Sequence, residues 1–572
     1  MTDVAALLEK LKNRGVPRGV VLEADWTELP AETGGGTPSP MSLMSGGLEA
    51  FNKPLTLRQT VDALHHAAAD PNVAALVVRV QPLMTAPSVV QELSDAIGVF
   101  RAAGKRTVAY AETFNGTGGY VLASAFETVV LQPAGSLALL GRVATVGFYR
   151  NALEWAGVKM DMGKRHEYKN APNIFLETGF TEPHAEATTA LLADLNDQAV
   201  TTIAAARAIE ESVVRDAMLR GPLSSADALA SGLIDVAGFR DEAYAKALGL
   251  HGSATSLLYL AKWVKKTAND KARKAALKNA QSIALITIDG GIAPGKSGFQ
   301  PGLQPGNGTG SDTAGAALRA AAKDPKVKAV ILRVDSPGGD VVASETIWRE
   351  VGLVQRAGKP VVTSMASVAA SGGYYVAMGT DRIVANAATI TGSIGVFGGK
   401  PVIGRMREKL RIHTGQLATD DNADVGSLQH GYSPAQRARA DEMLDTIYAE
   451  FTGRVADGRG MSVEDVHEVA RGRVWTGQAA SERGLVDELG GFRVAVAAAK
   501  RLAGIDEHAV VKIAVFPKAR PIDKLFPKDS SAAAQAVIGW MAAGVVRAAR
   551  EWEQRAGAAS VRSRLDGDWR VW

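Results

Sequence analysis

The chain has 572 residues, a formal net charge of +4, 46% apolar residues and 22% charged residues. At about 150 residues per domain this length predicts two to four domains, and the composition is that of a globular protein rather than a disordered, collagenous or densely membrane-embedded one. So small an excess of positive charge does not indicate nucleic-acid binding. The absence of cysteine excludes disulfides, a thiol nucleophile, thiolate zinc sites and cysteine-ligated iron–sulfur clusters.

The two ends of the chain carry no strong membrane signal. Charged side chains interrupt the segment from Met1 to Val20, so no secretory signal peptide or N-terminal anchor is visible. The stretch from Ser530 to Val546 is weakly charged and rich in alanine, but it is marginal in length for spanning a bilayer. We expect this stretch to form a buried or interfacial helix.

The two halves of the chain follow the same predicted order of elements. Each half opens with an apolar strand, followed by a loop rich in glycine and proline, a helix, a β-branched strand, a second helix, a third strand and a helix of small residues. This alternation predicts parallel sheets covered by helices, the α/β class. The opening strand, the loop and the β-branched strand are expected at 19–24, 33–47 and 74–80 in the first half. In the second half they are expected at 283–288, 290–310 and 329–334.

The second half is a copy of the first. Ala67–Val80 (AAADPNVAALVVRV) matches Ala321–Val334 (AAKDPKVKAVILRV) at an offset of 254 residues. Further on, Ser224–Asp235 matches Thr476–Asp487 at an offset of 252 residues. Self-similarity that holds at a nearly fixed offset is the signature of an internal repeat.

The sequence therefore predicts a duplicated α/β domain with a linker and a tail. Basic residues gather between the copies on a helical pattern, which is typical of a solvated linker helix; the alternative is a helix that attracts anionic lipid. The expected boundaries are 1–251 for the first copy, 252–281 for the basic helical linker, 282–515 for the second copy and 516–572 for a C-terminal tail, expected to be helical.

Two motifs of the second copy lie directly after predicted strands. Val334–Asp340 (VDSPGGD) can form a turn whose backbone N–H groups point into a cleft, and Met365–Ala377 (MASVAASGGYYVA) places Ser371 at the start of a helix. Together they suit a serine nucleophile with an oxyanion hole built from backbone donors near Gly339 and Gly372. The alternative is that these small residues only allow helices to pack closely.

A serine nucleophile needs a base, most often a histidine. The second copy holds few histidines, notably His413, His430 and His467, and none of them lies in a setting typical of a catalytic pocket. The alternative base is a desolvated lysine, because burial lowers the pKa of the amine until its neutral form can accept a proton.

The repeat offset indicates which lysine this is. Ser371 corresponds to Thr117, so the first copy has lost the primary hydroxyl. The first copy contains Lys169 in the segment EYKNAPNIF, and the matching position of the second copy is Ala423. Each copy would then retain one half of a Ser–Lys pair. The alternative is that Lys169 is a solvated surface lysine.

Four motifs of the second copy occur in a fixed order. They are KVKAVILRVDSPGGDVVASE (326–345), AGKPVVTSMASVAASGGYYVA (357–377), TGSIGVFG (391–398) and VWTGQAASERGLVDELG (474–490). With the duplication, they resemble the signal peptide peptidase A family in its long, tandem-domain bacterial form, and the resemblance extends from about Gly19 to Ala503. The family consists of serine peptidases that use a Ser–Lys dyad on the Clp/crotonase fold. The resemblance therefore implies two tandem Clp/crotonase-like domains.

The resemblance also implies a role for each residue of the site. Ser371 aligns with the family nucleophile, Lys169 with its general base, and Ser393 with a serine that orients the lysine. The oxyanion donors carry over to Gly339, in preference to Gly338, and to Gly372. The implied reaction is acyl transfer through an acyl-enzyme, with no metal, nucleotide or other cofactor.

The expected partners follow from the same resemblance. They are apolar peptides, such as signal peptides left in membranes after cleavage, and three further copies of the chain in a homotetramer; nucleic acid is not expected. Long-form relatives commonly carry an N-terminal membrane anchor, which Met1–Val20 does not show. We therefore expect a cytoplasmic protein or a peripheral contact with the cytoplasmic membrane. The sequence leaves open whether Lys169 meets Ser371 within one chain or between chains.

Two other functions remain as alternatives. A crotonase-type acyl-CoA enzyme would use similar glycine-rich corners, although no glutamate acid or base stands beside either of them. A non-catalytic assembly scaffold would use both copies as interaction modules.

Overall fold

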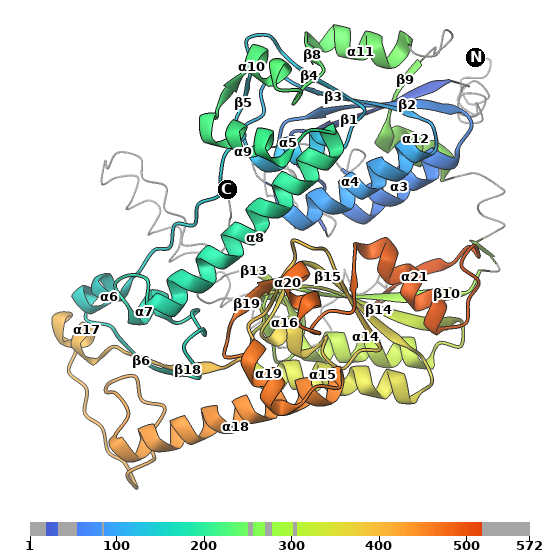
Figure 1. Ribbon diagram of the computed structural model, residues 1–572. Helices are drawn as coiled ribbons and strands as arrows, with labels where there is room; N and C mark the ends of the chain where they lie inside the picture. Colours follow the sequence, from blue (N-terminus) through green and yellow to red (C-terminus); the bar gives the residue numbers. More distant parts are fainter. Residues whose placement is uncertain are drawn as a thin grey trace, which may run out of the picture.

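The computed structural model describes residues 19–32, 54–82, 85–249, 256–268, 277–278, 280–300 and 306–517. Within these residues the chain forms two α/β units, one above the other in Figure 1, each built on a parallel sheet. The predicted α/β class is confirmed. The C-terminal segment from Ser530 to Val546 and nearly all of the expected tail lie outside the described residues.

The first unit is built on a sheet of six parallel strands in the order β8-β4-β3-β2-β1-β9. Its strands β1 to β4 are buried on both faces, as expected for a parallel sheet covered by helices. The elements of this half are β1 (Val20–Trp26), α3 (Leu57–Ala69), β2 (Val73–Val80), α4 (Pro87–Ala102), β3 (Arg106–Ala111), α5 (Thr117–Ser124), β4 (Thr128–Leu131), β5 (Ser136–Leu137), α6 (Arg150–Ala156), β6 (Lys159–Lys164), α7 (Asn173–Leu176), α8 (Glu182–Arg207), α9 (Glu211–Arg220), β7 (Leu223–Ser224), α10 (Ser225–Ala230), β8 (Val236–Ala237), α11 (Arg240–Gly249), β9 (Ser256–Tyr259) and α12 (Leu260–Thr267).

The second unit repeats this plan with parallel strands in the order β20-β16-β15-β14-β10-β21. Two further strands extend the sheet beside β15: β17 pairs with it in parallel, and β19 pairs antiparallel with β17. The elements are β10 (Ser282–Asp289), β11 (Ile292–Ala293), β12 (Gly298–Gln300), β13 (Gly306–Gly310), α14 (Ser311–Lys323), β14 (Val327–Ser336), α15 (Val341–Arg356), β15 (Val361–Ala370), α16 (Gly372–Tyr375), β16 (Arg382–Ala385), β17 (Ile390–Gly392), β18 (Phe397–Val402), α17 (Gly404–Lys409), α18 (Pro434–Arg459), α19 (Val463–Val469), β19 (Val474–Thr476), α20 (Gly477–Glu482), β20 (Glu488–Leu489), α21 (Phe492–Leu502) and β21 (Lys512–Phe516).

The segment expected as a basic linker, residues 252–281, belongs in part to the first unit. Strand β9 pairs in parallel with β1 at the edge of the first sheet, as β21 pairs with β10 in the second. In α12, Leu260 and Trp263 are buried in the first core, while Lys262, Lys265 and Lys266 are exposed. The apolar spacing that suggested one helix therefore spans a strand followed by a helix. The expected boundary at 515 also cuts through β21.

Part of the first half leaves its own unit and pairs with the second half. Strand β6 forms a two-stranded antiparallel sheet with β18. These two strands, with α6, α7 and α17, make an arm that projects from the two units (Figure 1). Helix α8 runs from the first unit toward this arm, and its Leu191 and Leu195 pack against Ala388 of the second unit.

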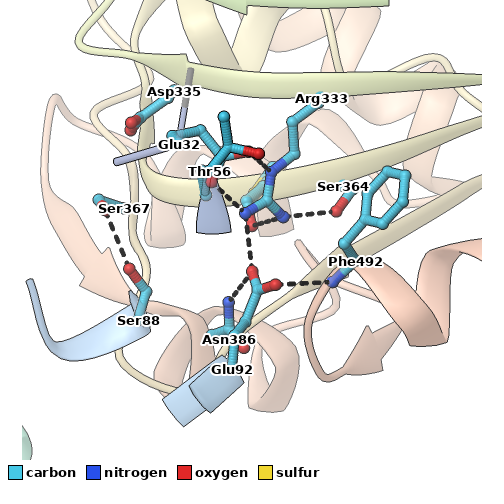
Figure 2. A network of polar contacts seen from close by, with 12 residues as sticks. Glu32, Thr56, Ser88, Glu92, Arg333, Asp335, Ser364, Ser367, Asn386 and Phe492 are labelled. Carbon is cyan, nitrogen blue, oxygen red and sulfur yellow. Dashed lines mark hydrogen bonds and ion pairs between the residues drawn. The ribbon is translucent and has the colours of Figure 1, made fainter. Parts of the chain in front are cut away.

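A buried ionic network holds the two units together (Figure 2). Arg333 of β14 makes two hydrogen bonds of 2.8 Å to Glu32 and one of 2.7 Å to Glu92 of α4, both in the first half. Glu92 also accepts hydrogen bonds from the Asn386 side chain and from the backbone N–H of Phe492. Because β14 leads into the Ser-Pro-Gly-Gly motif, this network ties the first half to a strand that carries part of the predicted site.

The network predicts unequal stability effects at two equivalent arginines. Replacing Arg333 by leucine leaves Glu32 and Glu92 in the interface without their cation, which costs about 3 to 5 kcal/mol of unfolding free energy. Arg79, its repeat equivalent, pairs with Asp25 and Glu112 at a more exposed position, so Arg79→Leu costs about 0 to 1 kcal/mol. Urea unfolding of the full chain measures both effects, and equal losses would contradict a special role for the Arg333 network.

Candidate active site

Ser371 lies between the end of β15 and the short helix α16. Its backbone is left-handed, with φ of 53°, which is strained for a residue with a side chain. The backbone N–H of Ser371 donates to the carbonyl of Gly392, at 2.8 Å, so the neighbouring strand β17 fixes this conformation. Helix α16 has only four residues. The expected contribution of a long helix dipole at Ser371 is therefore small.

Lys169 of the first half reaches Ser371 of the second half. Its Nζ lies 3.0 Å from the Ser371 Oγ. Lys169 follows β6, whose pairing with β18 brings the lysine segment against the second unit. The two residues meet within one chain, although 202 positions separate them in the sequence.

The Lys169 amine is removed from water. The residue is 2% exposed, and burial lowers the pKa of its amine to about 7 from an ordinary value of 10.5. A substantial fraction of the amine is therefore uncharged at neutral pH, and an uncharged amine has a lone pair that can accept a proton.

Ser393 contacts the same amine from β17's end. The Lys169 Nζ donates to the Ser393 carbonyl at 2.9 Å and lies 3.0 Å from its Oγ. Ser393 also has a left-handed backbone, with φ of 52°. Because Gly392 accepts the N–H of Ser371, the turn formed by Gly392 and Ser393 contacts both the serine and the lysine.

The Ser-Pro-Gly-Gly loop brings one free amide beside Ser371. Gly338 has φ of +104°, and its N–H already donates to the Ser336 Oγ at 3.2 Å. A Cβ placed on Gly372 would lie 3.1 Å from the Gly339 nitrogen, so the Gly339 and Gly372 amides are neighbours. As the first residue of α16, Gly372 has no acceptor for its N–H within that helix. The Gly338 N–H is therefore already engaged within the loop, whereas the Gly339 nitrogen lies beside Gly372.

A bulge in β15 precedes the serine. Val334 pairs with Met365, whereas Ser336 pairs with Ala369, so β15 contains two extra residues at this point. Asp335 fills the gap in the ladder by accepting the backbone N–H of Val368 at 3.0 Å. Its burial raises the pKa of this carboxyl to about 6. Bulges next to active sites re-aim the residues that follow them.

Two glycines that sequence reasoning missed pack against Lys169. A Cβ on Gly472 would lie 2.5 Å from the Lys169 backbone nitrogen, and one on Gly395 would lie 3.4 Å from its Cδ. Gly472 also has φ of +84°. Gly395 stands in the TGSIG motif, but no repeat offset or motif singles out Gly472, because its partner is distant in the sequence.

His413, His430 and His467 of the second copy do not contact Ser371 in the part of the chain that the structure describes. His413 and His430 are exposed, and His430 pairs with Asp424. The His467 Nδ1 lies 3.0 Å from the Tyr448 hydroxyl. The Lys169 amine lies within hydrogen-bonding distance of Ser371.

The equivalent corner of the first copy is closed. Thr117 donates its hydroxyl to the Leu140 carbonyl and accepts the Leu140 N–H, so this hydroxyl is bound to the backbone. The side chain of Thr85, the repeat equivalent of Gly339, fills the space beside Gly118. The Thr117 hydroxyl is therefore engaged by the backbone, unlike the Ser371 hydroxyl, which contacts the Lys169 amine.

A search of protein families matches the model for peptidase family S49 to residues 99–253 and 354–506, one segment in each half. The chain belongs to peptidase family S49. It is a serine peptidase. The expectation of a peptidase, rather than an acyl-CoA enzyme or a scaffold, is confirmed at this level.

Relatives with similar sequences are also named as proteases or peptidases. The chain is 32% identical over 467 residues to Protease 4 of Salmonella typhi, covering 79% of this chain and 73% of that protein. It is 29% identical over 492 residues to the chloroplastic serine protease SPPA of Arabidopsis thaliana, covering 86% and 71%. It is also 34% identical over 195 residues to a putative signal peptide peptidase SppA of Enterococcus faecium, covering 34% and 57%.

The packing of Gly472 predicts that a single methyl group will disable the peptidase. In Gly472→Ala the new Cβ pushes against the Lys169 backbone and displaces its amine, so peptide hydrolysis should fall at least about tenfold. Gly484→Ala is the matched control. Gly484 also has positive φ, but its Cβ would meet only the Met461 sulfur at 3.8 Å. Equal activity of the two variants in a peptide-hydrolysis assay would contradict the account.

Proposed function

We propose that the chain is a serine endopeptidase in which Ser371 is the nucleophile, Lys169 the general base and Ser393 the residue that orients the base. The observation that carries the proposal is the 3.0 Å separation between the Lys169 Nζ and the Ser371 Oγ, with the amine buried. Burial supplies the uncharged base that the reaction needs, because it lowers the pKa of the amine.

In the first step, Lys169 takes the hydroxyl proton of Ser371 as Oγ attacks the peptide carbonyl carbon. The ammonium then gives this proton to the leaving amine as the C–N bond breaks, which leaves an acyl-enzyme on Ser371. Water attacks the ester, Lys169 takes a proton from that water, and Ser371 recovers its proton on release of the new carboxyl end. Throughout, Ser393 holds the amine at two atoms.

The negative oxygen of each tetrahedral intermediate would be bound by the amides of Gly339 and Gly372. Their support is positional: the Gly339 amide neighbours Gly372, while the Gly338 amide is bound to Ser336. Fixed backbone donors of this kind stabilise the developing charge without reorganisation during the reaction.

We further propose that the two units are tandem copies of one Clp/crotonase-like domain. Both sheets have the same six-strand parallel order. The long helices α8 and α18 each have 26 residues and stand at equivalent positions of the two halves. Duplication followed by loss of the hydroxyl in one copy and of the lysine in the other explains why neither copy holds a complete dyad.

The proposed substrates are unfolded or apolar peptides, such as remnant signal peptides. The support is the name of the Enterococcus faecium relative, a putative signal peptide peptidase. No nucleic-acid partner is proposed.

We also propose that the protein is a homotetramer in the cytoplasm or at the cytoplasmic membrane surface. Trp155, Leu410 and Leu417 on and beside the arm are strongly exposed apolar side chains, which suit contacts between copies. The exposed lysines of α12 suit a peripheral contact with anionic lipid. Among the residues that the structure describes, no helix has the length and apolar character needed to cross a bilayer.

Two substitutions test the dyad. Ser371→Ala and Lys169→Met should each reduce hydrolysis of an unstructured apolar peptide by at least about a thousandfold. Methionine has the length of lysine without its charge, so Lys169→Met should unfold at a temperature at least as high as the parent at pH 7.

Lys164→Met is the matched control. Its amine donates a hydrogen bond to Asn173 in the same segment and does not contact Ser371 in the described part of the chain, so hydrolysis should stay within about twofold of the parent rate. Hydrolysis near the parent rate by folded Ser371→Ala or Lys169→Met would overturn the proposal.

A further inference from the structure

The segment that carries Lys169 is held by a stack of alternating rings and guanidinium groups. This segment lies between β6 and α7, outside any helix or strand that would fix it. The stack is formed, in order, by Arg471, Tyr168, Arg473, Trp475 and Arg483. Neighbouring members are separated by 3.9 to 5.5 Å between guanidinium carbon and ring centroid. These distances are within the range of cation–π attraction.

Arg473 occupies the centre of the stack. Its guanidinium carbon lies 4.8 Å from the ring centroid of Tyr168, the residue before Lys169, and 4.5 Å from that of Trp475. Arg473 also pairs with Glu186 of α8 at 2.8 Å, and Glu186 accepts the Tyr168 hydroxyl at 2.5 Å. One guanidinium thus fixes the Tyr168 ring directly and its hydroxyl through a carboxylate.

The backbone of Arg473 contacts the other side of the site. Its carbonyl accepts the N–H of Ser393 at 2.7 Å, and Ser393 holds the Lys169 amine. Trp475 packs on Gly392, since a Cβ there would lie 3.0 Å from the indole Cδ1. Gly392 in turn accepts the N–H of Ser371. The stack therefore joins the lysine segment to the turn that fixes the serine.

The first copy has no equivalent of the stack. At the 252-residue offset, Arg473, Trp475 and Arg483 correspond to Gly221, Leu223 and Ser231. The stack is found in the copy that must receive a lysine from the other half, and it is missing from the copy whose corner is closed. This distribution links the stack to the dyad rather than to the fold common to both copies.

We propose that Arg473 is a positioning residue for the dyad. Its guanidinium packs on Tyr168 and its backbone carbonyl accepts the N–H of Ser393, and these contacts keep the Lys169 amine beside Ser371. This inference rests on the proposed function. The carboxylates that pair with the stack are Glu167, Glu186 and Glu482, with Arg471, Arg473 and Arg483 respectively. Arg473 does not touch the reacting atoms. Its effect is on the position and solvation of the amine.

The test is Arg473→Met in the full chain. We expect kcat for an unstructured peptide to fall at least tenfold while KM stays within about twofold, because the substrate still binds but the amine is misplaced. Water reaching the amine would also move the acidic limb of the kcat–pH profile upward by about one pH unit. Thermal unfolding checks that the variant is folded.

Arg501→Met is the control, since Arg501 is exposed on α21, pairs with Glu488 and lies outside the stack. It should leave kcat and the acidic limb unchanged. If Arg473→Met does not fold, Tyr168→Leu takes its place with the same readouts, and Tyr168→Phe, which keeps the ring, should retain at least half of the activity.

Unchanged kcat and an unmoved acidic limb in folded Arg473→Met would overturn the inference, as would an equal loss in Arg501→Met. These experiments distinguish a failure of this inference from a failure of the proposed function. Activity in Ser371→Ala would refute the dyad itself, whereas an inactive Ser371→Ala beside a fully active Arg473→Met would refute only the role of Arg473.

Discussion

A lysine amine that stays partly uncharged at neutral pH has to be buried, and burial of a lysine costs stability. The shift in the pKa of Lys169 from 10.5 to about 7 corresponds to a cost on the order of 4 to 5 kcal/mol at neutral pH. Between these two values the unfolded chain binds more protons than the folded one, so folding becomes more favourable as pH rises through this range. Much of the second unit's local structure serves to keep this amine dry and in place.

The burial of Lys169 depends on contacts between the two halves of the chain. The lysine segment comes from the first half, and it is held by the pairing of β6 with β18, by Gly472 and by the two hydrogen bonds that the Lys169 amine makes to Ser393. The Arg333 network joins the same two halves on the strand that precedes the Ser-Pro-Gly-Gly loop. A chain whose halves separated would expose the amine and lose the base. In this account, catalytic activity requires that the two halves of the chain stay packed together.

The sequence predicts much of this arrangement because the duplication supplies an internal comparison. The α/β class follows from the alternation of strands and helices, and the candidate pair follows from reciprocal losses at Thr117 and Ala423. Other features depend on three-dimensional contacts that no spacing records. The choice of Gly339 over Gly338 depends on where the Ser336 hydroxyl points, and the Arg473 stack is built from residues about 300 positions apart. The linker was misjudged because β9 is too short to show a strand pattern beside α12.

The most direct test of the account is the pH dependence of Ser371 acylation by a neutral serine-directed probe, measured in a single turnover. The rate should rise with pH and level off above a midpoint near 7, because only the uncharged Lys169 amine can accept the serine proton. In Lys169→Met the rate should be lower by several orders of magnitude and lack this midpoint. A midpoint near 10, or the same midpoint in Lys169→Met, would contradict the claim that a buried, uncharged Lys169 is the base.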